Sequence, residues 1–222
     1  MENNKFVYEN SLKNQKKKYI FKYLNAEKYI NRPLASLIVR SVYKTNITPN
    51  QLTYSAFLIS LPGILLIAIG GYANIVVGGI LVYLSFVIDA ADGMLARSKG
   101  CGTEYGKYLD LFLDRVSDFL ILLGVIINKF RMTDNKDWLI FGLFILSMYM
   151  LQIILFYVKN LYLKRESGIS GDARGLIGLV ILVFALLNRI DLLLYLGAVE
   201  VAIVIPYRII NFIVLGIKNK EQ

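Results

Sequence analysis

Long apolar stretches alternate with short polar ones along this chain. No Lys, Arg, Asp or Glu occurs from Thr45 to Ile88, and a second charge-free run covers Trp138 to Val158. A helix needs about 20 apolar residues to cross a bilayer, so the first run accommodates two passes joined by a turn at Gly70 and Gly71. The pattern predicts an all-α polytopic membrane protein.

Six transmembrane helices are predicted, separated by turn residues and polar loops. They run Asn50–Gly71, Asn74–Arg97, Thr103–Asn128, Trp138–Val158, Gly175–Asn188 and Asp191–Lys218. Thr48 and Pro49 mark the start of the first helix, because the threonine side chain can cap free amides and proline suits the first turn. The loops are residues 129–137 and 159–174, and the last span is interrupted by Glu200, Pro206 and Arg208.

The first 45 residues differ from the rest and are predicted to form a separate region. Residues 1–44 hold ten Lys or Arg against three Asp or Glu. From Tyr19 onward apolar residues recur among basic ones, which predicts an amphipathic helix on the membrane surface, broken at Pro33. The predicted division is therefore a basic tail with a surface helix over residues 1–45, and a six-helix domain over residues 46–222.

The net charge of +9 indicates a class of partner only when it is considered together with the apolar spans. In a soluble protein this excess would suggest nucleic acid, but here it fits topology and anionic lipid, so no nucleic-acid partner is expected. The basic N-terminal region and the positive loops 97–107 and 159–174 fall on one side. The positive-inside rule places both termini at the cytoplasmic face of the cell membrane.

Residue usage narrows the chemistry. The chain has no histidine and a single cysteine, Cys101. Histidine-based triads, zinc sites built on His and intramolecular disulfides are therefore excluded. Catalysis must use carboxylates, Lys or Arg, hydroxyls and hard metal ions.

Aspartates supply the strongest candidate chemistry. Asp89 and Asp92 are spaced i,i+3 and Asp110 and Asp114 i,i+4, so each pair shares a helix face on neighbouring antiparallel spans. Ionisable residues inside a membrane are functional by default, and four converging carboxylates require neutralisation. Oxygen-only ligands favour two Mg²⁺ or Mn²⁺ ions, an arrangement suited to phosphoryl transfer. A fifth aspartate, Asp118, is three residues from Arg115 and can pair with it.

Two other classes of function remain open at this level. A transporter also uses buried aspartates, although the far halves of spans two and three, residues 76–86 and 119–127, carry no charge. A non-catalytic scaffold would leave the spacing of the aspartates unexplained.

The segment Asp89-Ala-Ala-Asp92-Gly93-Met-Leu-Ala96-Arg97, followed by Gly106, Asp110 and Asp114, resembles the signature of the CDP-alcohol phosphatidyltransferase family. That signature is D-x2-D-G-x2-A-R-x8-G-x3-D-x3-D, and all eight specified positions match across 26 residues. Thr48 to Thr53 also look like the start of that family's first span. The resemblance implies an integral membrane transferase of phospholipid biosynthesis, and a homodimer.

The resemblance also implies roles for individual residues. Asp89 and Asp110 would bridge two metal ions, Asp92 would serve the first, and Asp114 would serve the second and act as general base. A hydroxyl would attack the phosphorus next to the lipid of a CDP-linked donor such as CDP-diacylglycerol and expel CMP. The implied CDP pocket consists of Asn50, Thr53, Gly93, Arg97, Thr103 and Gly106.

The resemblance implies a small alcohol or polyol phosphate as the acceptor, and it leaves the individual compound open. Segments 30–33 and 170–174 loosely resemble the family branch that makes di-myo-inositol-phosphate-type products, whose donor is a soluble CDP-inositol. That donor is the alternative to a lipid-linked one. Candidate anchors for an acceptor phosphate are Arg174, Arg208, Lys164 and Arg165. The positive-inside rule alone accounts for Lys164 and Arg165, and Arg208 can instead pair with Glu200.

Overall fold

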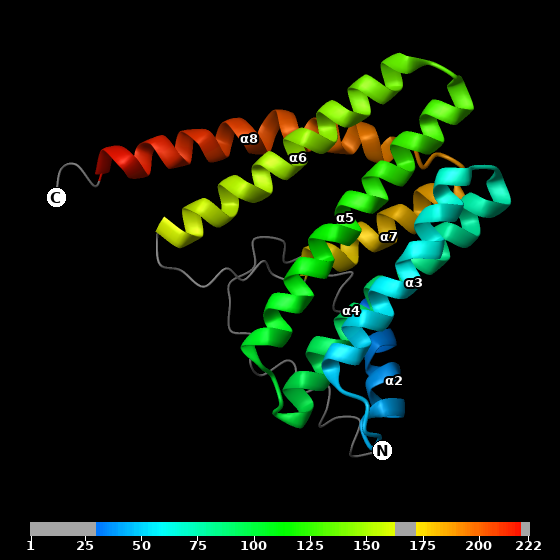
Figure 1. Ribbon diagram of the computed structural model, residues 1–222, viewed down its shortest axis with the longest axis vertical. Coiled ribbons are helices and arrows are strands. Elements are labelled where there is room, and N and C mark those ends of the chain that lie inside the picture. The colour runs from blue at the N-terminus through cyan, green and yellow to red at the C-terminus, as the bar shows by residue number, and fades with distance from the viewer. Residues whose placement is uncertain (1–29, 163–171, 219–222) are drawn as a thin grey trace.

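A computed structural model of the chain describes residues 30–162 and 172–218, and these form seven helices and no strand (Figure 1). The prediction of an all-α protein is confirmed. The predicted basic tail and Lys164 and Arg165 lie outside the described residues. The helices are α2 (Arg32–Val42), α3 (Pro49–Ile69), α4 (Tyr72–Lys99), α5 (Glu104–Thr133), α6 (Lys136–Tyr162), α7 (Asp172–Leu186) and α8 (Leu192–Lys218).

Helix boundaries follow local capping chemistry. Thr48 caps α3 as predicted: its hydroxyl accepts from the amide of Gln51, whose side chain accepts from the amide of Thr48. One boundary prediction is wrong. Most of the predicted loop 129–137 is helical, because α5 continues to Thr133 and ends where Asp134 adopts a left-handed conformation with φ 48°. The last predicted span corresponds to α8, which is continuous through Pro206.

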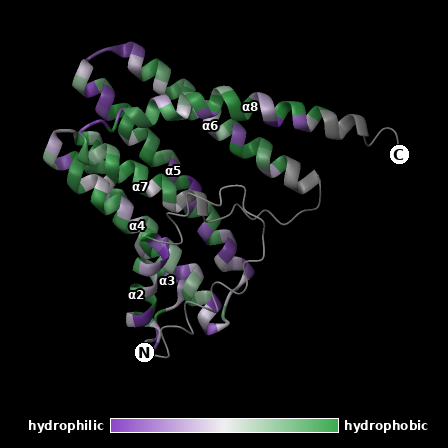
Figure 2. Ribbon diagram, turned by 180° about the vertical axis from the view of Figure 1, so that it is seen from behind, coloured by the Kyte–Doolittle hydropathy of each residue, from purple (hydrophilic) through white to green (hydrophobic). Residues whose placement is uncertain are grey.

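Four helical segments are long and apolar enough to cross a membrane: Pro49–Ile69, Tyr72–Lys99, Lys136–Val158 and Leu192–Asn211. α5 has the length but carries charged residues through its first half. α7 has 15 residues, which at 1.5 Å per residue span about 22 Å, less than a hydrocarbon core of about 30 Å. In Figure 2 the apolar colouring dominates the middle of the helices, and the polar colouring gathers at the loops. The six-span arrangement remains a prediction.

The long helices α3 and α4 pack closely along their length, and α5 joins them (Figure 1). Glycines permit this approach. A Cβ at Gly78 would lie 2.6 Å from the carbonyl oxygen of Gly63, and a Cβ at Gly63 would lie 2.9 Å from that of Gly78. Small residues that bring backbones together are a typical device of helix packing in membranes. This contact holds α3 and α4 in the register that the candidate site requires.

α2 lies along α4 and runs in the same direction. Near its start, the hydroxyl of Tyr83 donates to Asn31 over 2.9 Å. After its end, the ammonium of Lys99 donates to the carbonyls of Thr45 and Ile47, each over 3.0 Å. Its Ala35 and Val39 are fully buried, so α2 has one apolar side that faces α4. Its predicted position on the membrane surface remains untested.

An ion pair ties together the end of the bundle that is remote from the aspartates. Lys129 of α5 lies 3.0 Å from the carboxylate of Asp191, in the turn between α7 and α8, and 4.6 Å from the ring centre of Trp138. Arg189 contacts the same carboxylate at 3.4 Å. Burial alone would raise the pKa of Asp191, but these two cations together hold that pKa below its ordinary value.

Candidate functional site

Three aspartates meet where α4 and α5 face each other. Carboxylate oxygens of Asp89, Asp92 and Asp110 all lie within 4.8 Å of one another. Asp92 is only 6 % exposed, and the other two are partly buried. The helical spacing places Asp89 and Asp92 one turn apart on α4, so both side chains reach the same point on α5. The predicted convergence is confirmed for these three.

A hydroxyl from a third helix completes this cluster. Thr53 of α3 donates to Asp92 Oδ2 over 2.5 Å. Thr53 was predicted to line the CDP pocket, but here it contacts a carboxylate of the cluster. A group that hydrogen-bonds a candidate metal ligand fixes the orientation of that ligand.

The fourth predicted ligand, Asp114, stands at the wall of a pocket between α3, α4 and α5. Asp89 lines the same pocket, so the two carboxylates share one space. Ser85 and Ser117 add hydroxyl groups to the wall, while Phe57 and other apolar side chains close it. Asp114 is therefore beside the three-carboxylate cluster and next to a space that a small group can enter.

Three of the residues predicted for the CDP pocket gather where α3 and α5 begin. Thr103 caps α5 by accepting from the amide of Gly106 over 3.0 Å. A Cβ at Gly106 would lie 2.9 Å from Asn50 Oδ1 and 3.2 Å from Thr103 Oγ1. Gly106 therefore leaves room for these two polar side chains to meet over bare backbone.

Arg97 and Gly93 form a second predicted part of that pocket. A Cβ at Gly93 would lie 3.2 Å from Nη1 of Arg97, so the guanidinium folds back over the glycine one turn earlier on α4. The absence of a side chain at Gly93 thus leaves room for the guanidinium on this face of α4. A planar guanidinium in that position is suited to a phosphate group.

The donor set fits a divalent cation. Carboxylate and hydroxyl oxygens are the ligands of hard ions, and the described part of the chain offers no imidazole or thiolate beside them. Three carboxylates this close repel one another, and a bound cation removes that repulsion. Asp89, Asp92 and Asp110 could therefore hold a metal ion.

The predicted acceptor anchors are only partly located. Arg174 lies in the first turn of α7, with its side chain outside the described residues, and Lys164 and Arg165 lie outside them altogether. Arg208 of α8 donates to the carbonyl of Gln152 over 2.7 Å. The alternative of a direct ion pair between Arg208 and Glu200 is not observed among the described residues. Gln152 contacts both residues and donates to Glu200 over 2.9 Å.

Polar residues of α6 were missed by sequence reasoning. Tyr149 and Gln152 interrupt a span that looked uniformly apolar because it carries no charge. Their i,i+3 spacing was the available signal, since it places both on one helix face. Tyr149 donates to Asp118 over 3.0 Å, and Asp118 forms the predicted ion pair with Arg115 at 2.9 Å.

Curated proteins of known name include relatives of this chain. The chain is 30 % identical over 179 residues to a bifunctional IPC transferase and DIPP synthase of Aquifex aeolicus, covering 78 % of this chain and 40 % of that protein. It is 34 % identical over 119 residues to an archaetidylinositol phosphate synthase of Pyrococcus horikoshii, covering 53 % of this chain and 61 % of that one. The chain thus spans less than two thirds of the length of these curated relatives.

A solved structure shares the fold. The phosphatidylinositol phosphate synthase of Mycobacterium tuberculosis, solved with CDP-DAG bound, aligns with a TM-score of 0.57 at 23 % identity, over 78 % of this chain and 90 % of that one. The family model described as CDP-alcohol phosphatidyltransferase matches residues 46–206, a range that contains every aspartate of the cluster. The chain is therefore a member of the CDP-alcohol phosphatidyltransferase family.

Proposed function

We propose that this protein transfers a phosphatidyl or other substituted phosphate group from a CDP-linked donor, such as CDP-diacylglycerol, to a hydroxyl of a small alcohol or polyol phosphate. CMP is the second product, and the reaction belongs to phospholipid biosynthesis. The observation that carries the proposal is the convergence of Asp89, Asp92 and Asp110 within 4.8 Å in a chain of this family.

Asp89, Asp92, Asp110 and Asp114 would hold two Mg²⁺ or Mn²⁺ ions. Bound there, such ions neutralise the charge of the donor diphosphate and of the departing CMP. Thr53 orients Asp92 through its hydrogen bond and so belongs to this assembly.

Asp114 is the proposed general base. It lines the pocket beside Asp89, where an acceptor hydroxyl can approach the cluster. Asp114 takes the hydroxyl proton, the oxygen forms a bond to the phosphorus that carries the lipid, and the bond from that phosphorus to CMP breaks. Arg97, Asn50, Thr103 and Gly106 would hold the CDP part of the donor.

The acceptor class is proposed from the relatives. One of them is a phosphatidylinositol phosphate synthase of Mycobacteroides abscessus, 33 % identical over 97 residues. A cyclic polyol phosphate is therefore the first acceptor to test, with Arg174 and Arg208 as anchors for its phosphate. A soluble CDP-inositol donor is the second candidate, and the similarity to the bifunctional IPC transferase and DIPP synthase favours testing it.

The proposed setting is an integral membrane homodimer with six spans, in which α5 and α7 cross the bilayer alongside the four helices of sufficient apolar length. Residues 1–45 form the basic tail and surface helix, and residues 46–222 form the catalytic domain. Both termini and the aspartate cluster lie on the cytoplasmic side, in agreement with the distribution of Lys and Arg.

The deciding experiment is CMP release by purified protein in detergent. CDP-diacylglycerol is supplied with Mg²⁺ and, one at a time, inositol 1-phosphate, glycerol 3-phosphate, inositol or serine. We expect CMP with one acceptor class, loss of CMP on chelation by EDTA, and recovery with Mg²⁺ or Mn²⁺. Asp89→Asn should abolish release, whereas Asp137→Asn, at an exposed carboxylate remote from the cluster, should not.

The donor is exchanged if CDP-diacylglycerol gives no product. Turnover with CDP-inositol would assign the second candidate. Absence of CMP with both donors, or an active Asp89→Asn variant, would refute the proposal. The alternative function as a transporter would then be tested by measuring transport in proteoliposomes, which requires no CMP release.

A further inference from the structure

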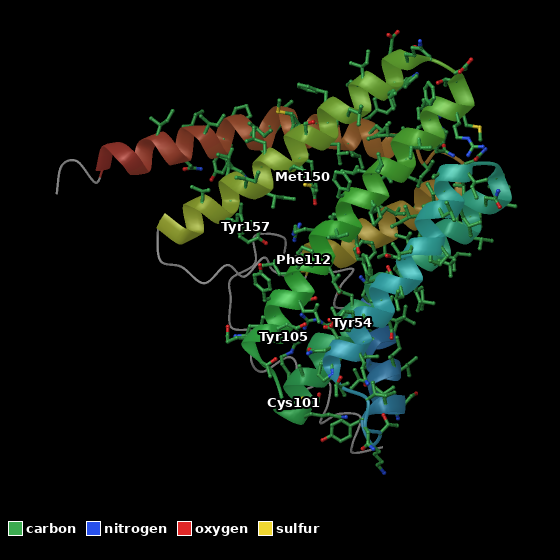
Figure 3. The ribbon with its side chains drawn as sticks, viewed as in Figure 1. Tyr54, Cys101, Tyr105, Phe112, Met150 and Tyr157 are labelled. Atoms are coloured by element: carbon green, nitrogen blue, oxygen red, sulfur yellow. The ribbon has the colours of Figure 1, made fainter. Side chains whose placement is uncertain are left out.

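The residues proposed to hold the CDP part of the donor belong to three helices, whose ends must be fixed relative to one another. They are Arg97 near the end of α4, Asn50 in the first turn of α3, and Thr103 and Gly106 at the start of α5. The hydroxyls of Tyr54 and Tyr105 lie 3.4 Å apart, so the starts of α3 and α5 are neighbours. Figure 3 shows both tyrosines at the end of the bundle where Cys101 follows α4.

The start of α5 is held close to the end of α4 by the chain itself. α4 ends at Lys99 and α5 begins at Glu104, so only residues 100–103 connect them. Gly100 closes α4 in a left-handed conformation with φ 64°, and its amide donates to the carbonyl of Ala96. Glycine in this conformation is a common helix end, at which the chain reverses within a few residues. The short loop therefore leaves the start of α5 little freedom relative to α4.

The start of α3 depends on a contact between distant parts of the chain. The turn at Gly70 and Gly71 joins α3 to α4 only at the opposite end of these helices. At the near end, the ammonium of Lys99 donates to the carbonyls of Thr45 and Ile47, each over 3.0 Å. Both carbonyls lie in the segment between α2 and α3. A charged donor forms stronger hydrogen bonds than a neutral one, so Lys99 holds this segment against the end of α4.

A short and stiff stretch of chain connects the carbonyl of Ile47 to Asn50. Thr48 is extended, with φ −91° and ψ 155°, and its reciprocal hydrogen bonds with Gln51 keep it in this conformation. Pro49 follows, and its ring fixes its own φ while it also restricts the residue before it. A displacement of the Ile47 carbonyl therefore carries Asn50 with it.

The place of Asn50 matters because it meets the start of α5 at close range. A Cβ at Gly106 would lie 2.9 Å from Asn50 Oδ1 and 3.2 Å from Thr103 Oγ1, so both side chains occupy the space that the glycine leaves. Thr103 is itself fixed, since it accepts from the amide of Gly106 over 3.0 Å. A misplacement of about 1 Å can strongly weaken a group of residues that acts together on a ligand.

We propose that Lys99 is a positioning residue for binding of the CDP part of the donor. Its ammonium fixes the segment before α3, and Asn50 thereby keeps its place beside Thr103 and Gly106. The inference rests on the function proposed above and adds a residue to it. Lys99 falls among the eight unspecified positions between Arg97 and Gly106 in the family signature, so the signature assigns it no role. Lys99 spends its donors on two backbone carbonyls and acts on the donor through Asn50.

The first test replaces the Lys99 ammonium. Binding of CMP to the full-length protein in detergent with Mg²⁺ is measured by calorimetry, because every CDP-linked donor contains CMP. Lys99→Met keeps an unbranched side chain without donors, and it should raise the dissociation constant of CMP about 10-fold, the effect of a lost charged hydrogen bond. Lys99→Arg retains a charged donor and should stay within about 3-fold of the wild-type protein. Lys99 is half-buried at a helix end, so both variants are expected to fold.

Kinetics separate positioning from a general loss of structure. In Lys99→Met the KM of the donor should rise by the same factor as the dissociation constant of CMP. The kcat and the Mg²⁺ concentration for half-maximal activity should stay at their wild-type values, because Thr53 still donates to Asp92 and the carboxylates are unchanged.

Tyr83→Phe is the matched control. The Tyr83 hydroxyl also donates from α4 to the N-terminal region of the structure, to Asn31 over 2.9 Å. Tyr83 lies 16 residues before Lys99 on α4, about 24 Å along the helix at 1.5 Å per residue, so its bond is remote from Asn50. We expect Tyr83→Phe to leave the dissociation constant of CMP unchanged.

A double-mutant cycle tests whether Lys99 acts through Asn50. Asn50→Ala alone should weaken CMP binding, because it removes the side chain that Lys99 positions. Lys99→Met in the Asn50→Ala background should then add less than about 3-fold, since residues that act on one contact give non-additive effects.

Unchanged CMP binding in Lys99→Met would overturn the positioning role, and the proposed reaction would stand as long as the wild-type protein releases CMP. Additive losses in the cycle would also overturn it, because Lys99 would then contact the nucleotide directly. An equal loss in Tyr83→Phe would overturn it by showing that any weakening of the contacts of α4 has the same effect. A selective, non-additive loss in a protein that releases no CMP from either donor would support the positioning role while refuting the proposed reaction.

Discussion

The hydrogen bond from Thr53 to Asp92 gives the most direct test of how α3 contributes to the site. Thr53→Val retains the branched shape and removes only the hydroxyl that donates over 2.5 Å to a carboxylate that is 6 % exposed. A hydrogen bond to a charged group contributes about 1.5–3 kcal/mol, and groups that orient a metal ligand typically change metal affinity about 10- to 100-fold. We expect the Mg²⁺ concentration for half-maximal activity to rise by about that factor.

The assay is CMP release as a function of free Mg²⁺ at saturating donor. Activity of Thr53→Val should return toward the wild-type level at high Mg²⁺, because the carboxylates themselves remain. Thr133→Val is the matched control: its hydroxyl donates over 2.8 Å to the carbonyl of Lys129 within α5, at the other end of the bundle. If Thr53→Val left the Mg²⁺ dependence unchanged and raised only the KM of the donor, Thr53 would contact the CDP substrate instead, and our assignment would be wrong.

Three further predictions concern the base, the helix contact and the remote ion pair. Asp114→Asn should abolish CMP release while CDP-diacylglycerol still binds, and a rate within a few-fold of wild type would remove Asp114 from the role of base. Gly78→Ala places a methyl group 2.6 Å from the carbonyl oxygen of Gly63, so α3 and α4 must move apart. We expect the free energy of unfolding to fall by about 1–3 kcal/mol in a reversible unfolding assay. An unchanged free energy of unfolding would show that the two helices can move apart without cost. The pKa of Asp191 is lowered in the folded state, so its contribution to stability is complete above the ordinary value of 3.8 and is lost as the pH falls below it. Unfolding followed from pH 7 to pH 3 should show this loss, and Asp191→Asn should remove that part of the dependence; an identical pH profile in the variant would contradict the assignment.

The helical spacing of the aspartates carried most of the information that the sequence held about the site. Neighbours at i,i+3 and i,i+4 share a face in any helix, so the closeness of Asp89 and Asp92 follows from local geometry. The closeness of Asp110 to this pair follows once the two helices are predicted to be antiparallel neighbours. The ion pair of Arg115 with Asp118 is likewise a one-turn contact. The helix start at Thr48 followed from its own capping box.

Predictions that required packing between distant segments were incomplete or wrong. Thr53 and Asp92 are 39 residues apart, and nothing local indicates which face of α3 meets α4. Gln152 stands between Glu200 and Arg208 for the same reason, since α6 supplies a polar group that the sequence of α8 cannot reveal. The continuation of α5 to Thr133 was missed because polar residues suggest a loop, although they are equally compatible with the exposed end of a helix.

By itself, the sequence determined the all-helical class, the apolar spans, the family signature and the faces on which its carboxylates lie. These properties depend on hydrophobic length and on contacts within one or two helical turns. The tertiary structure decided which faces meet: α2 lies along α4, the Thr53 hydroxyl contacts Asp92, and the Tyr149 hydroxyl of α6 contacts Asp118 of α5. The physical reason is that the pairing of faces depends on close packing summed over the whole bundle, in which bare backbone at Gly63 and Gly78 sets how closely two helices approach.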